Sequence, residues 1–219
     1  NCAVALQKGK ILGIVPKTYL PNHKENAEAR WFSSASDHTE TNIRLCGQNV
    51  PLGTNLLFDT AETCFGIEMG EDVWAPVPPS SNLSLKGAEI IFNTAAVTES
   101  IGKQTYLRTL LSQQSARCLG GYVFSSCGFG ESTTDVVFGG NGLIYENGTL
   151  LAASERFSLK EQLIISEIDV ERIRNERRAN TTFSANMTQC LKESTTHIST
   201  ELVNQRDLIL TRPIDASPF

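Results

Sequence analysis

Two carboxylates follow directly on a short apolar segment that has the length of a buried strand. Glu71 and Asp72 come after the predicted strand at 65–69 and before a proline-rich turn. Side chains at a strand end can act as a general acid or base, or bind the ammonium group of a small ligand. Glu71 is the better ligand candidate because it lies nearer the strand end. Alternatively, both carboxylates cap the turn or helix that begins near Pro76.

The position between the strand and these carboxylates is where a nucleophile is expected, and residue 70 is a glycine. Glycine has no side chain that could attack a carbonyl carbon. It suits a backbone that approaches another group closely or adopts a left-handed conformation. Cys64 would lie roughly 20 Å away along an extended chain, and Cys118 falls on the inward face of a predicted helix. Neither cysteine is therefore expected to replace a thiol at the strand end.

The remaining residue types that bind metals are scattered. His23, His38 and His197 lack partners at the spacing of a metal site, so we expect surface histidines and no metal. The six cysteines form neither a CxxC pair nor a cysteine–histidine cluster with zinc spacing. They predict free thiols in a reducing compartment, and hence a cytoplasmic protein.

The bulk composition is that of a globular domain. The chain has 219 residues, of which 40% are hydrophobic and 20% charged, which suits one domain or one domain with a tail. A formal net charge of −5 argues against nucleic acid or an anionic membrane as the main partner. The sequence contains no run of about eighteen apolar residues, so no membrane-spanning helix is predicted.

Strand signals outnumber helix signals along the chain. We expect a hairpin at 2–8 and 11–16, strands at 56–58, 65–69, 88–93, 122–126, 136–138, 142–145, 149–152 and 163–170, and helices at 76–85, 102–120 and 169–180. The helix at 102–120 is amphipathic, whereas the one at 169–180 is dense in charge and is predicted to be solvated, with i,i+4 pairs. This order favours two stacked sheets with helices outside.

Several stretches resemble one protein family, in order along most of the chain. They are residues 1–22, which end in PKTYLPN, then RWFSS at 30–34, EDVWAPVPPS at 71–80, QSARCLGGYV at 114–123, GESTTDVVF at 130–138, ENGTLLA at 146–152 and SERF at 154–157. Together they resemble the glutaminase domain of glutamine-dependent NAD(+) synthetases, which are members of the nitrilase or carbon–nitrogen hydrolase superfamily.

This resemblance implies an α/β fold, a four-layer α-β-β-α sandwich that here lacks its N-terminal part. It implies a glutaminase domain at 1–185, followed by a polar segment and linker at 186–219 toward a synthetase domain. In the family, a Glu–Lys–Cys triad hydrolyses glutamine through a thioester. The ammonia passes to the synthetase domain, which amidates nicotinic acid adenine dinucleotide. ATP and magnesium belong to that domain, so no cofactor is expected here, and the family implies a homo-oligomer.

Carried onto this sequence, the catalytic lysine is Lys17, which in the family stabilises the oxyanion of the tetrahedral intermediate. Pro16 before it favours an extended chain and so directs the lysine. The second, structural glutamate is Glu28 or Glu25. The nucleophile falls on Gly70, and the general-base glutamate lies upstream of Asn1.

The glutamine pocket is expected to involve six side chains, namely His23, Glu28, Glu71, Trp74, Val97 and Lys103. Some positions depart from the family pattern: His23, Asn26 and Ala27 stand where aromatic residues are usual. Residues 94–97 replace the small hydroxyl residues that usually line the pocket. Departures concentrated around one pocket indicate a degenerate or altered site.

Three hypotheses follow for the function. The chain is the glutaminase part of an NAD(+) synthetase, and without the thiol it does not hydrolyse glutamine. Alternatively, it is a non-catalytic module that docks a partner through the loop at 130–135 and the tail after residue 207. A nitrilase-like amidase acting on another amide ranks last, because it would need the same thiol.

Overall fold

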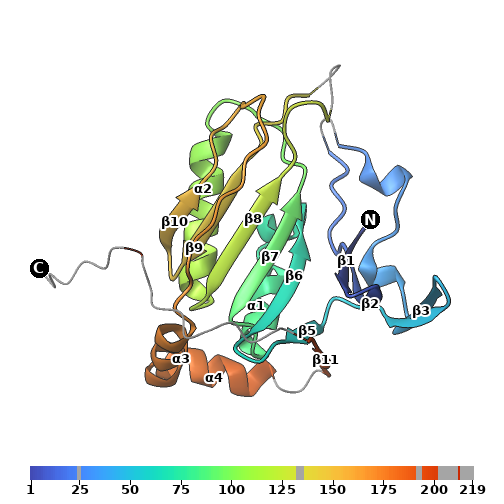
Figure 1. Cartoon of the computed structure of the whole chain (residues 1–219), viewed down its shortest axis with the longest axis vertical. Helices are drawn as coiled ribbons and strands as arrows, with labels where there is room; N and C mark the ends of the chain where they lie inside the picture. Colours follow the sequence, from blue (N-terminus) through green and yellow to red (C-terminus); the bar gives the residue numbers. More distant parts are fainter. Residues whose placement is uncertain (24–25, 132–135, 191–193, 202–211, 213–219) are drawn as a thin grey trace, which may run out of the picture.

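The computed structural model describes residues 1–23, 26–131, 136–190, 194–201 and 212 (Figure 1). Its centre is a seven-stranded sheet in the order β10-β9-β8-β7-β6-β5-β11. The strands of this sheet are β5 (Leu56–Asp59), β6 (Cys64–Met69), β7 (Ile90–Ala95), β8 (Gly121–Ser126), β9 (Gly142–Glu146), β10 (Thr149–Ala153) and β11 (Thr196–Ser199). Strands β6, β7 and β8 are parallel to one another, so their carboxyl ends meet at one edge of the sheet.

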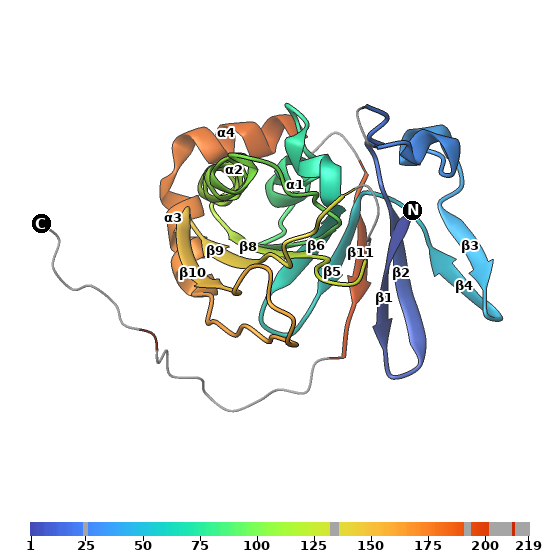
Figure 2. The same ribbon diagram turned by 90° about the horizontal axis from the view of Figure 1, so that it is seen from above.

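Helices cover one face of this sheet (Figure 2). They are α1 (Pro79–Leu85) and α2 (Lys103–Arg117), whereas α3 (Val170–Ala179) and α4 (Thr181–Cys190) lie at the end of the sheet where β7 and β8 begin (Figure 1). Leu107 and Leu111 of α2 pack with Tyr122 and Phe124 of β8, and all four side chains are almost completely buried. Apolar side chains spaced by four on the helix thus pack against side chains spaced by two on the strand, and together they form one apolar core.

A hairpin packs on the opposite face, near β5 and β11. It consists of β1 (Cys2–Gln7) and β2 (Lys10–Pro16), and Val15 joins Leu56 and Phe58 in a second apolar cluster. Gly13 permits this close approach, because a Cβ there would lie only 3.0 Å from side-chain atoms of Leu56 and Ile198. The chain then forms short 3-10 helices at Glu28–Arg30 and Ala35–Asp37, and a small sheet of β3 (Asn42–Leu45) and β4 (Gln48–Pro51).

The predicted layers are present as helices, a seven-stranded sheet and the two-stranded β1–β2 sheet. A second outer layer of helices is not seen among the residues that the structure describes. None of the described helices is long and apolar enough to cross a membrane. The predicted hairpin, the predicted strands that correspond to β5–β10 and the helix predicted at 102–120 are confirmed, whereas β3 and β4 were not predicted. At 136–138, Phe138 makes only an isolated bridge to Thr98.

One predicted strand of the carboxyl-terminal part is absent. The strand predicted at 163–170 is wrong: this segment has no regular structure before α3, and Leu163 and Ile165 are 84% and 78% exposed. An apolar run forms a strand only where a neighbouring strand can pair with it. The boundary predicted at residue 185 falls inside α4, and β11 adds Thr196–Ser199 to the sheet by pairing with β5.

The charged helix α3 is anchored to the domain through two of its arginines, so the prediction of a merely solvated helix is wrong. The Arg177 guanidinium donates to the backbone carbonyls of Ala88 at 2.7 Å and of Leu119 and Cys118 at 2.9 Å. Burial lowers the pKa of this group. Arg174 binds the Glu89 carboxylate. The predicted i,i+4 pairing does occur between Arg172 and Glu176.

Asp72 joins the lysine segment to the end of β6. Its carboxylate, which is only 1% exposed, accepts the backbone N–H of Tyr19 at 2.7 Å, of Thr18 at 3.2 Å and of Met69 at 3.3 Å. Burial raises the pKa of this carboxyl, while the three N–H donors act in the opposite direction. Asp72 therefore caps the 3-10 helix at Gly70–Trp74 and not the helix after Pro76, and it also binds a segment far away in the chain.

We predict that Arg177→Ala lowers the free energy of unfolding by about 3 kcal/mol, because it leaves several buried carbonyls without a donor. Urea denaturation followed by circular dichroism measures this loss. Arg178→Ala is the matched control, since Arg178 is the exposed neighbour on the same helix, and it should change stability by less than about 0.5 kcal/mol. Equal effects of the two variants would refute the anchoring role.

Asp72→Ala should also cost about 3 kcal/mol, because three backbone N–H groups lose their acceptor. Asp72→Asn keeps one acceptor oxygen and should cost less. The same denaturation experiment tests both variants, with Glu71→Ala as the control at the neighbouring carboxylate. If Asp72→Ala were no more destabilising than Glu71→Ala, the account of this junction would be wrong.

Candidate active site

Residue 70 occupies a sharp turn from strand to helix. β6 ends at Met69, and a 3-10 helix at Gly70–Trp74 follows at once. Gly70 has a φ of +47°, in the left-handed region. An ideal Cβ at this position would lie 3.6 Å from Lys17 Nζ and 3.8 Å from Ala95 Cα, which are ordinary van der Waals contacts. A side chain at residue 70 therefore has room and would stand next to the lysine. Turns of this kind present nucleophiles in other folds.

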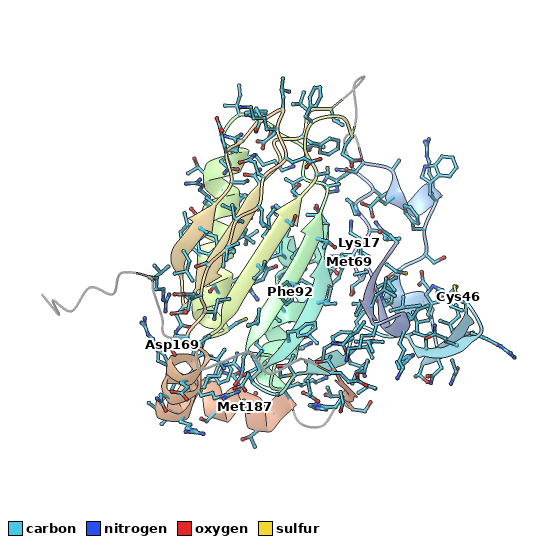
Figure 3. All side chains as sticks on the ribbon, in the orientation of Figure 1. Lys17, Cys46, Met69, Phe92, Asp169 and Met187 are labelled. Atoms are coloured by element: carbon cyan, nitrogen blue, oxygen red, sulfur yellow. The ribbon has the colours of Figure 1, made fainter. Side chains whose placement is uncertain are left out.

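Lys17 is a buried cation that pairs with the Glu28 carboxylate. It is 5% exposed, and its Nζ donates to the two Glu28 oxygens at 2.7 and 2.8 Å. Its backbone is fixed as well, because its N–H donates to the Asn1 carbonyl and its carbonyl accepts the Ala35 N–H, both at 2.9 Å. Figure 3 shows Lys17 beside Met69, at the carboxyl end of β6. Of the two glutamates predicted as its partner, Glu28 forms the pair, and Glu25 lies outside the described residues.

A cavity of about 240 Å³ opens in front of the turn. This volume corresponds to about eight water molecules, a size that suits one small molecule such as an amino acid. The ends of β6 and β7 and the segment around Lys17 enclose it. The lining residues are Asn1, Lys17, Pro21, Asn26, Glu28, Met69, Gly70, Glu71, Trp74, Thr94, Ala95, Ala96, Val97, Thr98 and Lys103.

Seven of the eight predicted site residues line this cavity. We call Lys17, Gly70 and Glu28, which lie around the Lys17 ammonium, the floor of the cavity, and Glu71, Trp74, Val97 and Lys103 its wall. His23 does not line it; His23 is exposed and borders an adjoining cavity that also contacts Glu71, Trp74 and Lys103. The sequence could not separate these two cavities, because Asn26, Glu71, Trp74 and Lys103 line both.

Opposite charges face this space from two different elements. Glu71 comes from the 3-10 helix after β6, and Lys103 comes from the first turn of α2. Lys103 Nζ donates to Thr98 Oγ1 at 3.1 Å, which draws the lysine toward the β7 end of the cavity. A carboxylate and an ammonium on the wall can bind the two charged groups of a free amino acid. Sequence reasoning missed Thr98, which carries no motif.

No cysteine among the described residues lines the cavity. Cys64 lies at the opposite end of β6 from residue 70. Burial, followed by the Asp59 carboxylate, raises the pKa of its thiol to about 12. Burial also raises the pKa of the Cys118 thiol, which lies at the end of α2. Since the thiolate is the nucleophilic form, neither cysteine is activated.

The residues described contain no group of three or more His, Cys, Asp or Glu side chains that could hold a metal ion. The arrangement offers the electrostatic effect of a buried ammonium beside residue 70. A ligand carbonyl placed over the turn would direct its oxygen to Lys17 Nζ.

Known proteins share this architecture. The sequence profile of the family described as carbon-nitrogen hydrolase matches residues 1–178 of the chain. The glutamine-dependent NAD(+) synthetase of Mycobacterium tuberculosis is 39% identical over 189 residues, an alignment that covers 85% of this chain and 28% of the relative. The chain thus spans little more than a quarter of the length of this relative.

Solved structures agree with the sequence comparison. A glutamine-dependent NAD(+) synthetase from Cytophaga hutchinsonii aligns with a TM-score of 0.64 at 25% identity, over 73% of this chain and 26% of that chain. A carbon-nitrogen hydrolase from Helicobacter pylori aligns with a TM-score of 0.66 at 19% identity, over 90% of this chain and 67% of that chain, which shows a shared fold. The predicted nitrilase-like fold is confirmed, and the chain belongs to the carbon–nitrogen hydrolase family.

Proposed function

We propose that this chain is the glutamine-binding domain of a glutamine-dependent NAD(+) synthetase, and that with glycine at residue 70 it binds glutamine without hydrolysing it. Relatives bearing that name support the family assignment. The observation that carries the proposal is the short distance between Lys17 Nζ and the Cβ position of residue 70, which is 3.6 Å. This is where a nucleophile would face its oxyanion stabiliser.

In a protein with a thiol at residue 70, the thiolate would attack the carboxamide carbon of glutamine. The carbonyl oxygen would take up negative charge next to Lys17, whose ammonium lowers the energy of the tetrahedral intermediate. The C–N bond would then break as the amide nitrogen takes up the proton that the thiol had given up and leaves as ammonia. Water would hydrolyse the thioester to glutamate and the free thiol. Glu28 positions the lysine and is occupied by it. With Gly70, the first bond cannot form.

Glutamine fits the charges of the cavity in one orientation. Its α-ammonium group would bind the Glu71 carboxylate, and its α-carboxylate would bind Lys103. Trp74 and Val97 would contact the aliphatic part of the ligand. The carboxamide would then reach the floor, between Lys17 and residue 70. His23 would lie near the entrance, since it borders the adjoining cavity.

The role in a larger protein is part of the same proposal. A synthetase domain that uses ATP and magnesium would receive ammonia and amidate nicotinic acid adenine dinucleotide, and the glutaminase domain itself would need no cofactor. A polar segment at 186–219 whose part after β11 is the linker, a homo-oligomer and a cytoplasmic location belong to this proposal as well. The family resemblance supports them.

A second candidate is a non-catalytic module that serves assembly or domain docking. An intact scaffold around a site that lacks its nucleophile favours it. The loop at 130–135 was the predicted docking element, and residues 132–135 lie outside the described residues. The two candidates differ in ligand binding, because a pure docking module has no need to retain a glutamine site.

We predict that the purified chain binds glutamine in isothermal titration calorimetry and releases no ammonia above the buffer blank. Glu71→Gln and Lys103→Met should each weaken binding about tenfold or more, because each removes one charge-assisted contact. Arg178→Ala, outside the cavity, is the control. Ammonia release by the chain as it stands would contradict the proposal, and absence of glutamine binding would favour the docking module.

A thiol introduced by Gly70→Cys should have a lowered pKa, because the Lys17 ammonium stabilises the thiolate. Mass spectrometry of the alkylated peptide at residue 70 as a function of pH measures this value separately from the other cysteines. The variant should lose about 1 kcal/mol of stability, since a side chain is strained at a positive φ. Adding Lys17→Met should return the thiol to its ordinary pKa, about 8.5. If alkylation of the thiol at residue 70 had the same pH dependence with and without Lys17→Met, the contact between this thiol and the Lys17 ammonium would be disproved.

A further inference from the structure

A side-chain amide behind the turn binds the backbone of residue 70. Asn93 lies on β7 and is 1% exposed. Its Oδ1 accepts the Gly70 N–H at 2.8 Å, and its Nδ2 approaches the Gly70 carbonyl oxygen at 3.5 Å. One primary amide thus faces both polar groups of this residue. The Asn93 amide thus accepts the N–H and faces the carbonyl of residue 70, as the backbone of a paired strand would do within a sheet.

The end of the pairing between β6 and β7 explains why residue 70 needs a side chain as its hydrogen-bond partner. The pairing of β6 with β7 sets Glu68 opposite Asn93 and ends with Met69 opposite Thr94. Residue 70 turns out of the sheet, so it loses the partners that continued pairing would have given it. Without Asn93, a buried N–H group would be left without an acceptor at the turn.

Asn93 is itself held by two further buried side chains. Its Nδ2 donates to the hydroxyl oxygen of Tyr122 on β8 at 3.0 Å. The Tyr122 hydroxyl donates in turn to the Glu68 carboxylate on β6. The other Glu68 oxygen accepts the Ser80 N–H at the start of α1, at 2.8 Å. The hydrogen-bond chain Glu68–Tyr122–Asn93 therefore connects three adjacent strands and a helix to the backbone of residue 70.

This buried hydrogen-bond network lowers the stability of the folded state, because it places a carboxyl group in the core. Glu68 is 1% exposed, and burial raises the pKa of its carboxyl to about 7. An apolar set of side chains in the same place would avoid the desolvation of a carboxylate. Buried polar networks whose members all have partners instead make one arrangement rigid and unique. The arrangement that this network makes unique is the turn at residue 70.

We propose that Asn93 is the positioning residue of this site, and that the chain Glu68–Tyr122–Asn93 fixes the left-handed backbone of residue 70 so that its Cα–Cβ bond points at Lys17. Strained conformations persist only where the surroundings enforce them. A non-glycine residue here would relax to a negative φ if Asn93 were absent, and its side chain would turn away from the lysine. The inference rests on the proposed function only in taking residue 70 as the position of the nucleophile.

The test uses the full chain with a thiol introduced by Gly70→Cys, and follows alkylation at residue 70 against pH. Adding Asn93→Ala should raise the thiol pKa by about one unit or more, toward the value obtained with Lys17→Met. A purely structural role would lower stability and leave this pKa unchanged. Ser115→Ala is the matched control: Ser115 is a buried polar residue that donates to the Gly120 carbonyl at 2.6 Å and has no contact with residue 70.

Tyr122→Phe in the same background provides a second variant, in case Asn93→Ala does not fold. It removes only the hydroxyl that holds the Asn93 amide and should shift the thiol pKa in the same direction by a smaller amount. An unchanged pKa in a folded Asn93→Ala or Tyr122→Phe variant would overturn the inference. A shift of the thiol pKa in the Ser115→Ala control would also overturn the inference, because the pKa would then respond to any destabilisation of the core.

This outcome is independent of glutamine binding. If the chain binds no glutamine but the thiol shifts as described, the proposed function fails and the positioning role stands. If glutamine binds while the thiol pKa is indifferent to Asn93, only the positioning role fails.

Discussion

The left-handed turn at residue 70 is the constraint on which the site depends. β6 ends at the edge of the sheet, and the backbone turns into a 3-10 helix at residue 70, whose φ is +47°. Asp72 fixes the far side of this turn by binding the N–H groups of Thr18 and Tyr19, the segment that carries Lys17. The segment that carries the lysine and the turn are thus joined through one buried carboxylate.

The buried Lys17–Glu28 pair sets the electrostatics of the cavity. A lone ammonium at 5% exposure would be costly, and the carboxylate at 2.7 Å compensates its charge. The pair as a whole is neutral, and the ammonium still lies 3.6 Å from the Cβ position of residue 70. It can therefore donate to a polarised carbonyl oxygen while Glu28 holds it in place. Glu71 and Lys103 lie farther out on the wall and suit the charged end of an amino acid.

Much of the fold and the floor of the site could be predicted from the sequence. Strand alternation and the helix period identified the β1–β2 hairpin and α2, and the family motifs brought Lys17, Glu28 and Gly70 together before any coordinates. These features are local, or they recur as motifs. The strand predicted at 163–170 failed because a strand requires a partner, and a sequence does not show which strand lies alongside. β11 was missed for the converse reason, since Thr196–Ser199 is short and polar and is ordered by pairing with β5.

Long-range polar contacts were the least predictable part. Arg177 looked like one of several solvated arginines, yet it binds carbonyls of segments that lie far away in the chain. Asn93 gave one weak signal, a polar residue at the end of an apolar strand, and its partners Glu68 and Tyr122 come from two other strands. Such contacts depend on the register between strands, which the sequence of a single strand does not specify.

A crystal structure of the chain grown with glutamine would test the central claim most directly. The account predicts the carboxamide carbon over residue 70, with the carboxamide oxygen within hydrogen-bond distance of Lys17 Nζ and the α-amino and α-carboxylate groups toward Glu71 and Lys103. Glutamine bound elsewhere, or a Lys17 side chain turned away from residue 70, would contradict it.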